Sequence, residues 1–173
     1  MTFPLCLWSV IDKRLRFITL LVLDCDGVLT DGTIPRRFSV YDGAGIKGFI
    51  DSGKKVIILS GAPWDRNLQE RAEKLGIWHV FSGVKDKGLF LEFFLEANNI
   101  NPEKVLYMGD DLNDLPAFRK AGISVAPKNA VKIIRNEADF VTKKEGGNGA
   151  VRELCDLLLK TDGNYKAVKK YIR

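Results

Sequence analysis

Two short apolar segments, each followed directly by carboxylates, constrain this chain more than any other feature of its sequence. The first is residues 20–23, which are wholly apolar, as a strand buried on both faces requires. Asp24 and Asp26 follow it. Because successive strand residues point to opposite sides, we expect these two side chains to share one side while Cys25 points to the other. Neighbouring carboxylates repel each other, and a hard cation such as Mg²⁺, which prefers oxygen ligands, would remove that repulsion.

Residues 105–114 repeat this plan, with an apolar strand, then a glycine, then carboxylates. An acidic turn after a core strand is the simpler interpretation of a lone Asp-x-Asp motif. Two such strand ends brought together, however, form a pocket of four carboxylates, which is too costly electrostatically for a structural role unless a metal ion lies in it. The sequence therefore predicts a metal site that combines the first motif with Asp110, Asp111 and Asp114.

Strands alternate with helices along the rest of the chain. Strands are expected at residues 20–23, 54–60, 78–81, 105–108, 123–126 and 140–141, and helices at 44–51, 64–75, 87–97, 115–121, 130–135 and 150–159. This alternation predicts an α/β fold, a Rossmann-like doubly wound parallel sheet with helices on both faces. In such sheets ligands bind beyond the carboxyl ends of the strands.

The chain of 173 residues suits one domain with its own hydrophobic core. We expect an N-terminal extension at 1–18, formed by a short extra helix or an imprecise start, the main domain at 19–162, and a basic tail at 163–173. The net charge of +5 is spread over scattered basic residues. That pattern is typical of a solvated surface rather than of nucleic-acid binding, although it would also attract an anionic substrate.

Three observations indicate a cytoplasmic protein. The cysteines at positions 6, 25 and 155 are widely spaced and lack metal-type pairing, which is typical of reduced thiols. The apolar N-terminal segment has no basic residue before it and no small-residue cleavage site after it, so it does not resemble a signal peptide. No stretch is long enough to span a membrane, and we expect no membrane partner.

Ser60 and Lys87 also fall at or just beyond the ends of expected strands. Together with Asp24 and Asp26 they form the set of groups that phosphoryl transfer needs. Asp24 can attack phosphorus and form an aspartyl-phosphate, while Asp26 can protonate the leaving oxygen and later activate water. Ser60 and Lys87 can hold the phosphoryl oxygens.

Three of these residues also have structural alternatives. A serine at a strand end often caps the following helix, so Ser60 has this second interpretation. A lone lysine such as Lys87 is most often a surface charge. Asp114, in the first turn of a helix, could be there for the helix dipole alone.

The order of these motifs resembles that of the haloacid dehalogenase superfamily of phosphatases. The matching segments are Asp-x-Asp-Gly-Val-Leu-Thr-Asp-Gly from Asp24, Ser60-Gly61, Lys87, and Gly-Asp-Asp-x-x-Asp from Gly109. More narrowly, the chain resembles the 3-deoxy-D-manno-octulosonate 8-phosphate phosphatases and their sialic-acid-type relatives. Support comes from Asp-Gly-x-Gly-Ile-Lys at 42–47, Arg-Ala-Glu-Lys-Leu-Gly-Ile at 71–77 and Gly-Gly-x-Gly-Ala-Val-Arg-Glu at 146–153.

The resemblance implies a role for each matching residue. Asp24 would be the nucleophile and Asp26 the acid/base. The ligands of Mg²⁺ would be the Asp24 carboxylate, the Asp26 backbone carbonyl and Asp110, with Asp111 and Asp114 in support. The positions that face the substrate or its phosphate would be Asp26, Asp42, Gly43, Lys47, Arg71 and Lys87.

The implied function is Mg²⁺-dependent hydrolysis of a phosphorylated sugar acid through an aspartyl-phosphate. The substrate would be 3-deoxy-D-manno-octulosonate 8-phosphate, from lipopolysaccharide biosynthesis, or a related nonulosonate 9-phosphate. The resemblance also implies the absence of a large cap domain and a tetramer whose subunits close one another's sites. Two alternatives stay open: a same-fold phosphatase for another small phosphometabolite, and a non-catalytic oligomerisation or partner domain associated with a cytidylyltransferase. The intact Asp26 argues against the second, because a binding domain does not need an acid/base.

The chain departs from the family pattern in its flap and in two arginines. Only nine residues, 33–41, occupy the place of the usual β-hairpin flap. Ala62 stands where the octulosonate enzymes carry arginine, and Asn148 stands where arginine is common, so two candidate contacts to a substrate carboxylate are lost. We therefore expect a homo-oligomer in which a neighbouring subunit covers the site with its loop at 146–149 or with its basic tail. Deletion of residues 163–173 is expected to alter KM or turnover without unfolding the protein.

Overall fold

A six-stranded, fully parallel sheet forms the centre of the computed structural model, which describes residues 13–164 and 166. The strand order is β3-β2-β1-β4-β5-β6. The strands are β1 (Leu20–Leu23), β2 (Lys55–Leu59), β3 (His79–Phe81), β4 (Val105–Met108), β5 (Ile123–Ala126) and β6 (Phe140–Val141). This confirms the doubly wound α/β sheet expected from the sequence, and β1, β4, β5 and β6 have the expected bounds.

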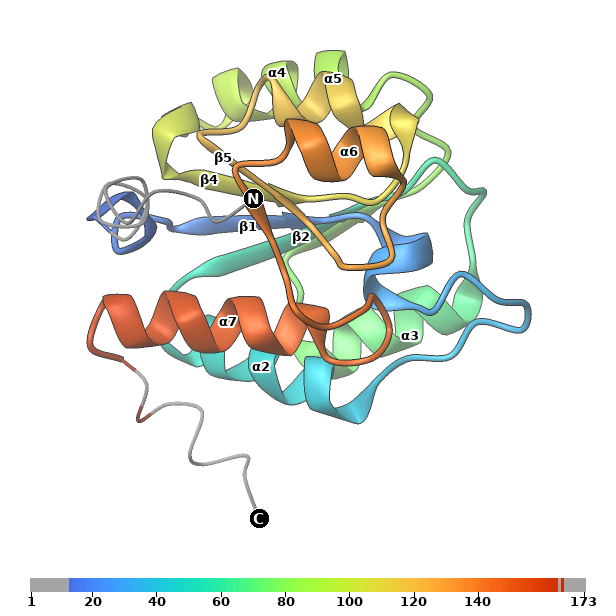
Figure 1. Ribbon diagram of the computed structural model, residues 1–173, viewed down its shortest axis with the longest axis horizontal. Helices are drawn as coiled ribbons and strands as arrows, with labels where there is room; N and C mark the ends of the chain where they lie inside the picture. The colour runs from blue at the N-terminus through green and yellow to red at the C-terminus, as the bar shows by residue number, and fades with distance from the viewer. Residues whose placement is uncertain (1–12, 165, 167–173) are drawn as a thin grey trace.

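Two layers of helices cover the sheet (Figure 1). One layer contains α2 (Val40–Asp51), α3 (Arg66–Leu75) and α7 (Ala150–Thr161), and the other contains α4 (Lys87–Ala97), α5 (Leu115–Phe118) and α6 (Lys132–Glu137). Short helical turns occur at η1 (Cys25–Leu29), η2 (Pro102–Lys104) and η3 (Leu112–Asp114). In the described part of the chain no large cap domain stands over the sheet.

The central strand β1 contributes to both layers of the core. Leu21 and Leu23 pack in the cluster that faces α2, α3 and α7. Leu20 and Val22 pack in the opposite cluster, with residues of α4, α5 and α6. Because alternate strand residues point to opposite faces, an uninterrupted apolar segment is what a strand between two helix layers requires.

Helix α2 begins four residues earlier than the expected 44–51. Ser39 is its N-cap, and the Ser39 hydroxyl accepts a hydrogen bond from the Asp42 amide at 3.3 Å. Asp42 and Gly43 therefore lie inside the first turns of the helix instead of preceding it. The signal was present in the sequence, since Ser39 followed by Asp42 is the pattern of an N-cap with an acidic residue in the first turn.

The Asp42 carboxylate caps a different helix, α7. Its two oxygens accept hydrogen bonds from the Gly149 amide at 3.2 Å and from the Arg152 amide at 2.8 Å. The N-cap residue of α7, Gly149, has no side chain that could bind these amides. Asp42 is 2% exposed. This buried contact joins α2 to α7, which lie side by side on one face of the sheet (Figure 1).

The packed core extends into the expected N-terminal extension. Residues 13–15 are helical, and Leu15 and Ile18 are buried in the cluster that faces α7. Residues 1–12, 165 and 167–173, which include Cys6 and most of the expected basic tail, lie outside the described residues. The division at residues 19 and 162 stays a prediction.

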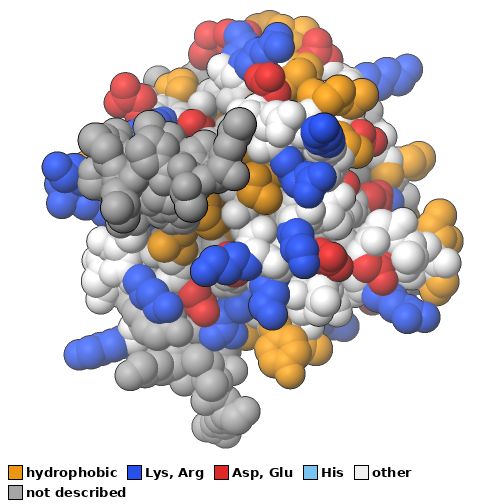
Figure 2. Space-filling model, in the orientation of Figure 1, with side chains coloured by type: hydrophobic (Ala, Val, Ile, Leu, Met, Phe, Trp, Pro, Cys, Tyr) orange, Lys and Arg blue, Asp and Glu red, His pale blue; other side chains and the backbone are white. Residues whose placement is uncertain are grey.

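The described surface mixes charges of both signs. Figure 2 shows lysine and arginine side chains interspersed with aspartate and glutamate over the face that it presents. Among the described residues, no helix combines the length and the apolar character needed to cross a membrane.

We predict that Asp42→Ala destabilises the protein by about 1–3 kcal/mol, because two buried amides at the start of α7 lose their acceptor. Asp42→Asn, which keeps one acceptor oxygen, should cost less. Urea unfolding measures both, and Glu70→Ala, which removes only an exposed ion pair with Arg66 on α3, is the control. An Asp42→Ala protein with unchanged stability and a raised KM would contradict the capping role and would place this carboxylate at the substrate.

Candidate active site

The strand register brings the two acidic motifs together. Leu23 at the end of β1 lies opposite Met108 at the end of β4, and the Asp24 amide donates to the Met108 carbonyl at 2.9 Å. β1 and β4 are also where the strand order reverses direction, and ligands of doubly wound sheets bind at such a point. Asp24, Asp110 and Asp114 each offer a carboxylate oxygen within 4.8 Å of the others. This confirms that the two motifs form one acidic cluster.

Lys87 binds two of these carboxylates. It is the first residue of α4 and its side chain is fully buried. Its Nζ lies 2.9 Å from Oδ1 of Asp24 and 2.6 Å from Oδ1 of Asp114. Lys87 is therefore no surface charge. Its ammonium is a buried partner of Asp24, the nucleophile expected from the sequence.

Asp114 holds the cluster together through hydrogen bonds at both of its oxygens. Oδ1 accepts from Lys87 and, at 2.7 Å, from the Tyr107 hydroxyl. Oδ2 accepts from the amides of Asp110 at 2.9 Å and of Asp111 at 3.2 Å. Four donors fill the lone pairs of one carboxylate, so Asp114 fits a supporting role better than that of a direct metal ligand.

Asp110 has the free oxygen that a metal ligand needs. Its Oδ1 is buried and has no hydrogen-bond partner. Gly27 leaves room for it: a Cβ on Gly27 would lie 2.0 Å from Oδ2 of Asp110, and φ at Gly27 is +81°. A buried carboxylate oxygen without a partner is costly, and the hard oxygen donors around it fit a divalent cation.

Burial and mutual repulsion raise the pKa values of the two candidate ligands. The pKa of Asp24 rises to about 7, chiefly because the carboxylate is buried and next because Asp114 is near, although Lys87 opposes both effects. The pKa of Asp110 also rises to about 7, through burial and the charges of Asp24 and Asp114. Burial alone would lower the pKa of Lys87, but the two carboxylates raise it, so the ammonium stays charged.

The Asp26 carboxylate lies apart from the cluster, which corrects the expected pocket of four carboxylates. Asp24 and Asp26 do not continue the strand, because residues 25–29 form the tight turn η1, closed by a hydrogen bond from the Thr30 amide to the Cys25 carbonyl at 3.1 Å. Instead of facing Asp24, Asp26 binds Arg36, with its two oxygens each 2.7 Å from a guanidinium nitrogen. Arg36 is a residue that the sequence analysis missed.

Ser60 and Asp111 each follow a central strand closely, Ser60 after β2 and Asp111 after β4. Ser60 follows β2, is 2% exposed and accepts a hydrogen bond from the Ala62 amide at 3.2 Å, so its hydroxyl proton remains available to another acceptor. It is not the cap of α3, because Asp65 has that role. Asp111 is exposed and caps η3 through the Leu112 amide at 2.7 Å.

A cavity of about 530 Å³ lies beside η1. Asn129 connects the wall of this cavity to η1, because its side chain donates to the Gly27 carbonyl at 3.1 Å and accepts from the Gly146 amide at 2.7 Å. Arg37, Tyr41 and Asn148 also line the cavity. Its size suits a small ligand, and its polar side chains suit a polar one.

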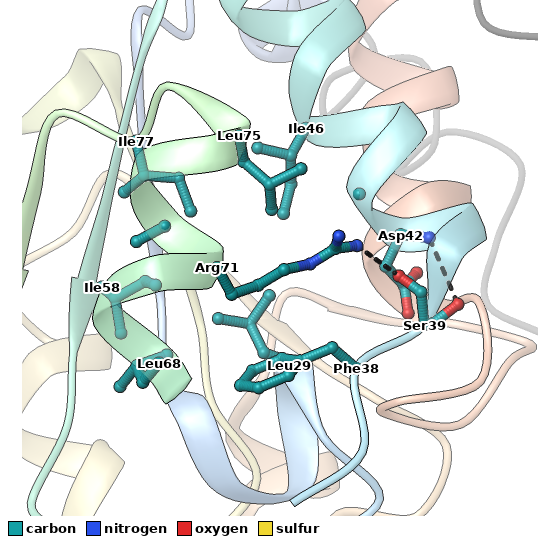
Figure 3. A pocket seen from close by; sticks show the side chains of 12 residues that line it. Leu29, Phe38, Ser39, Asp42, Ile46, Ile58, Leu68, Arg71, Leu75 and Ile77 are labelled. Carbon is teal, nitrogen blue, oxygen red and sulfur yellow. Dashed lines mark hydrogen bonds between the residues drawn. The ribbon is translucent and has the colours of Figure 1, made fainter. Parts of the chain in front are cut away.

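Arg71 and Gly43 lie in a separate and much smaller pocket between α2 and α3 (Figure 3), which leaves about 10 Å³ of free space. Arg71 extends from α3 toward the start of α2, and its Nη2 donates to the Ser39 carbonyl at 3.1 Å. A Cβ on Gly43 would lie 2.3 Å from that nitrogen. Lys47 is half-buried farther along α2. The described contacts of Asp42, Gly43 and Arg71 are with neighbouring helices, and their expected contacts with a substrate stay predictions.

Comparisons with known proteins show similar sequences and similar folds. The sequence profile of the haloacid dehalogenase-like hydrolases matches residues 71–154. The chain is 41% identical over 160 residues to the 3-deoxy-D-manno-octulosonate 8-phosphate phosphatase of Escherichia coli (strain K12), an alignment that covers 88% of this chain and 85% of that protein.

Two solved structures are similar in fold and in sequence. The 3-deoxy-D-manno-octulosonate 8-phosphate phosphatase of Yersinia pestis superposes with a TM-score of 0.86 at 38% identity, over 90% of this chain and 88% of that one. The enzyme of the same description from Moraxella catarrhalis, in complex with magnesium ion, phosphate ion and KDO, superposes with a TM-score of 0.89 at 35% identity, over 95% of this chain and 99% of that one.

We predict that the metal-free protein becomes more stable as the pH is lowered from 8 to 6. The folded state takes up protons at Asp24 and Asp110 near pH 7, whereas these groups titrate near 3.8 when unfolded. The folded state therefore gains about 1 kcal/mol per carboxylate over this range. Urea unfolding in EDTA measures the gain.

A divalent cation at pH 8 should remove this trend, because it takes the place of the protons. Asp110→Asn is the control variant, and it should show a smaller gain than the unaltered protein. Equal stability of the metal-free protein at pH 6 and pH 8 would contradict the assignment of the cluster as a site whose buried, mutually repelling carboxylates need a cation.

Proposed function

The chain belongs to the 3-deoxy-D-manno-octulosonate 8-phosphate phosphatase family of haloacid dehalogenase-like hydrolases, and we propose that it hydrolyses that sugar-acid phosphate or a close relative of it. The observation that carries the proposal is the pairing of a lysine-bound carboxylate, Asp24, with the unpartnered buried oxygen of Asp110. A nucleophile and a cation ligand thus lie within one cluster at the carboxyl ends of β1 and β4.

The residues that would hold Mg²⁺ are the Asp24 carboxylate, the Asp26 backbone carbonyl and Asp110. When bound, the cation neutralises charge on the phosphoryl group. Lys87 and Ser60 are proposed to bind the phosphoryl oxygens. Lys87 has three donors, of which two bind Asp24 and Asp114, so the third can point to a phosphoryl oxygen. The Ser60 hydroxyl can donate a hydrogen bond to a second phosphoryl oxygen.

The first step forms a covalent aspartyl-phosphate. Lys87 and the Cys25 amide both bind Oδ1 of Asp24, and we assign the attack on phosphorus to Oδ2. As the bond between Oδ2 and phosphorus forms, the bond between phosphorus and the sugar oxygen breaks. Asp26, in its protonated form, gives its proton to that oxygen, so the sugar acid leaves as an alcohol and Asp26 becomes the carboxylate that Arg36 binds.

The second step releases phosphate. A water molecule attacks the same phosphorus, and Asp26, now a carboxylate, accepts the proton of that water. The bond between Asp24 and phosphorus breaks, which restores the Asp24 carboxylate. Each step is an in-line displacement that depends mainly on orientation and on neutralised charge.

The cavity of about 530 Å³ beside η1 is the proposed place of the sugar acid. Arg37 is an exposed side chain in its wall and can bind a substrate carboxylate. Arg71 binds the Ser39 carbonyl within its own subunit, and substrate contacts by Lys47 and Arg71 stay predictions. The homo-oligomer, the tetramer, the cover by a neighbouring tail and the cytoplasmic location all stay predictions.

We predict that phosphate release from a panel of sugar-acid phosphates requires Mg²⁺ and is highest with an octulosonate or nonulosonate phosphate. Asp24→Asn should abolish release while leaving the circular dichroism spectrum unchanged, because an amide cannot attack phosphorus. Greater activity toward another class of phosphometabolite would replace the sugar-acid assignment. Phosphate release by the folded Asp24→Asn protein would rule out the mechanism.

We predict that Asp26→Asn loses turnover but keeps Mg²⁺ affinity within about threefold, because only the backbone carbonyl of this residue is an expected ligand. Calorimetric titration of the metal-free protein measures the affinity, and Asp110→Asn, which should lose binding, is the comparison. If Asp26→Asn lost Mg²⁺ as completely as Asp110→Asn, the Asp26 carboxylate would be a direct ligand.

A further inference from the structure

Arg36 connects three segments around the acid/base residue. Its Nε and Nη2 bind the two oxygens of Asp26, each at 2.7 Å, in a side-on pair. Its Nη1 binds Oδ2 of Asp65 at 2.8 Å. The Arg36 side chain is only 17% exposed, whereas that of Asp26 is 42% exposed. The guanidinium is therefore the more buried partner, and it holds the more exposed carboxylate of Asp26.

Arg36 and Asp65 each lie on a segment that is fixed by further hydrogen bonds. Arg36 lies on the short flap, whose base is closed by an antiparallel bridge between Thr30 and Phe38. Asp65 is the N-cap of α3, since its Oδ1 accepts from the Leu68 amide at 2.9 Å. The flap thus places the Arg36 guanidinium between η1 and the start of α3. A planar donor that binds both oxygens of a carboxylate fixes its direction as well as its position.

We propose that Arg36 is a positioning residue that holds the Asp26 carboxylate away from the acidic cluster, so that it faces the leaving group and does not bind the metal ion. This inference rests on the proposed role of Asp26 as the acid/base. The nine-residue flap would then act within its own subunit, by orienting a catalytic side chain.

Without a residue that fixes its orientation, the Asp26 carboxylate would compete for the metal ion. Asp26 lies two residues from Asp24, which belongs to the acidic cluster that is proposed to hold a divalent cation. A carboxylate that is not held by another group is itself a good ligand for such a cation. If it bound the cation, it would no longer reach the sugar oxygen, and misplacement of a catalytic group by about 1 Å can cost 100-fold in rate. The two hydrogen bonds from Arg36 oppose that movement.

The test compares Arg36→Met with the unaltered protein in two measurements. Arg36→Met keeps the length of the side chain and removes the guanidinium. We expect kcat to fall about 10- to 100-fold with KM nearly unchanged, because orientation is lost and substrate contacts are not. We expect the Kd for Mg²⁺, measured by calorimetry without substrate, to become about fivefold tighter or more, because Asp26 becomes an additional ligand.

A double-mutant cycle shows whether Arg36 acts through Asp26. In the Asp26→Asn background, Arg36→Met should leave the Mg²⁺ affinity unchanged. Arg66→Met is the matched control, since it removes a guanidinium whose side chain is 79% exposed on α3. Arg36→Lys should give intermediate values of kcat and Mg²⁺ affinity, and it decides the question if Arg36→Met does not fold.

Three outcomes would overturn the inference. Unchanged Mg²⁺ affinity in Arg36→Met would show that Asp26 does not move to the metal. A raised KM with unchanged kcat would make Arg36 a substrate-binding residue. An equal change in Mg²⁺ affinity with and without Asp26 would show that Arg36 acts through another group. Because the affinity is read without turnover, these results are separate from the question of which phosphate ester the protein hydrolyses.

Discussion

The ammonium of Lys87, buried between Asp24 and Asp114, is the interaction on which the rest of the site depends. Three carboxylates cluster at the carboxyl ends of β1 and β4, and this one buried cation binds two of them. When all are ionised, the cluster keeps two negative charges, which a divalent cation balances. Breaking a buried ion pair by removing one partner costs about 3–5 kcal/mol, so Lys87 is as necessary to the fold of this edge as to its chemistry.

The site divides its acidic residues among different tasks by giving each a different set of partners. Asp114 is saturated by four donors and supports the cluster. Asp110 keeps a free buried oxygen, as a cation ligand needs. Asp26 lies outside the cluster and is bound through both of its oxygens by Arg36. The proposed roles of support, ligand and acid/base thus fall to residues of one chemical type that differ in their hydrogen bonds.

The sequence was informative where a local pattern determined the structure. The apolar segments before Asp24 and Asp110 determined β1 and β4, and the parallel sheet then brought the two motifs together. The orientation of Asp26 was not predictable, because it depends on Arg36 in an irregular loop. The role of Asp42 depends on α7, far along the chain. The burial of Lys87 was also hidden, since an isolated lysine resembles a surface residue until its two carboxylate partners are placed beside it.

The most direct test of the central claim is to trap the phosphoryl group on Asp24. In Asp26→Asn the second step lacks its base, while p-nitrophenyl phosphate needs no acid for its first step because p-nitrophenolate is a good leaving group. The account predicts a burst of p-nitrophenolate of about one equivalent per active site, with the phosphoryl group found on Asp24 by mass spectrometry of the quenched protein. A burst with the phosphoryl group on another residue, or steady release of phosphate with no burst, would contradict it.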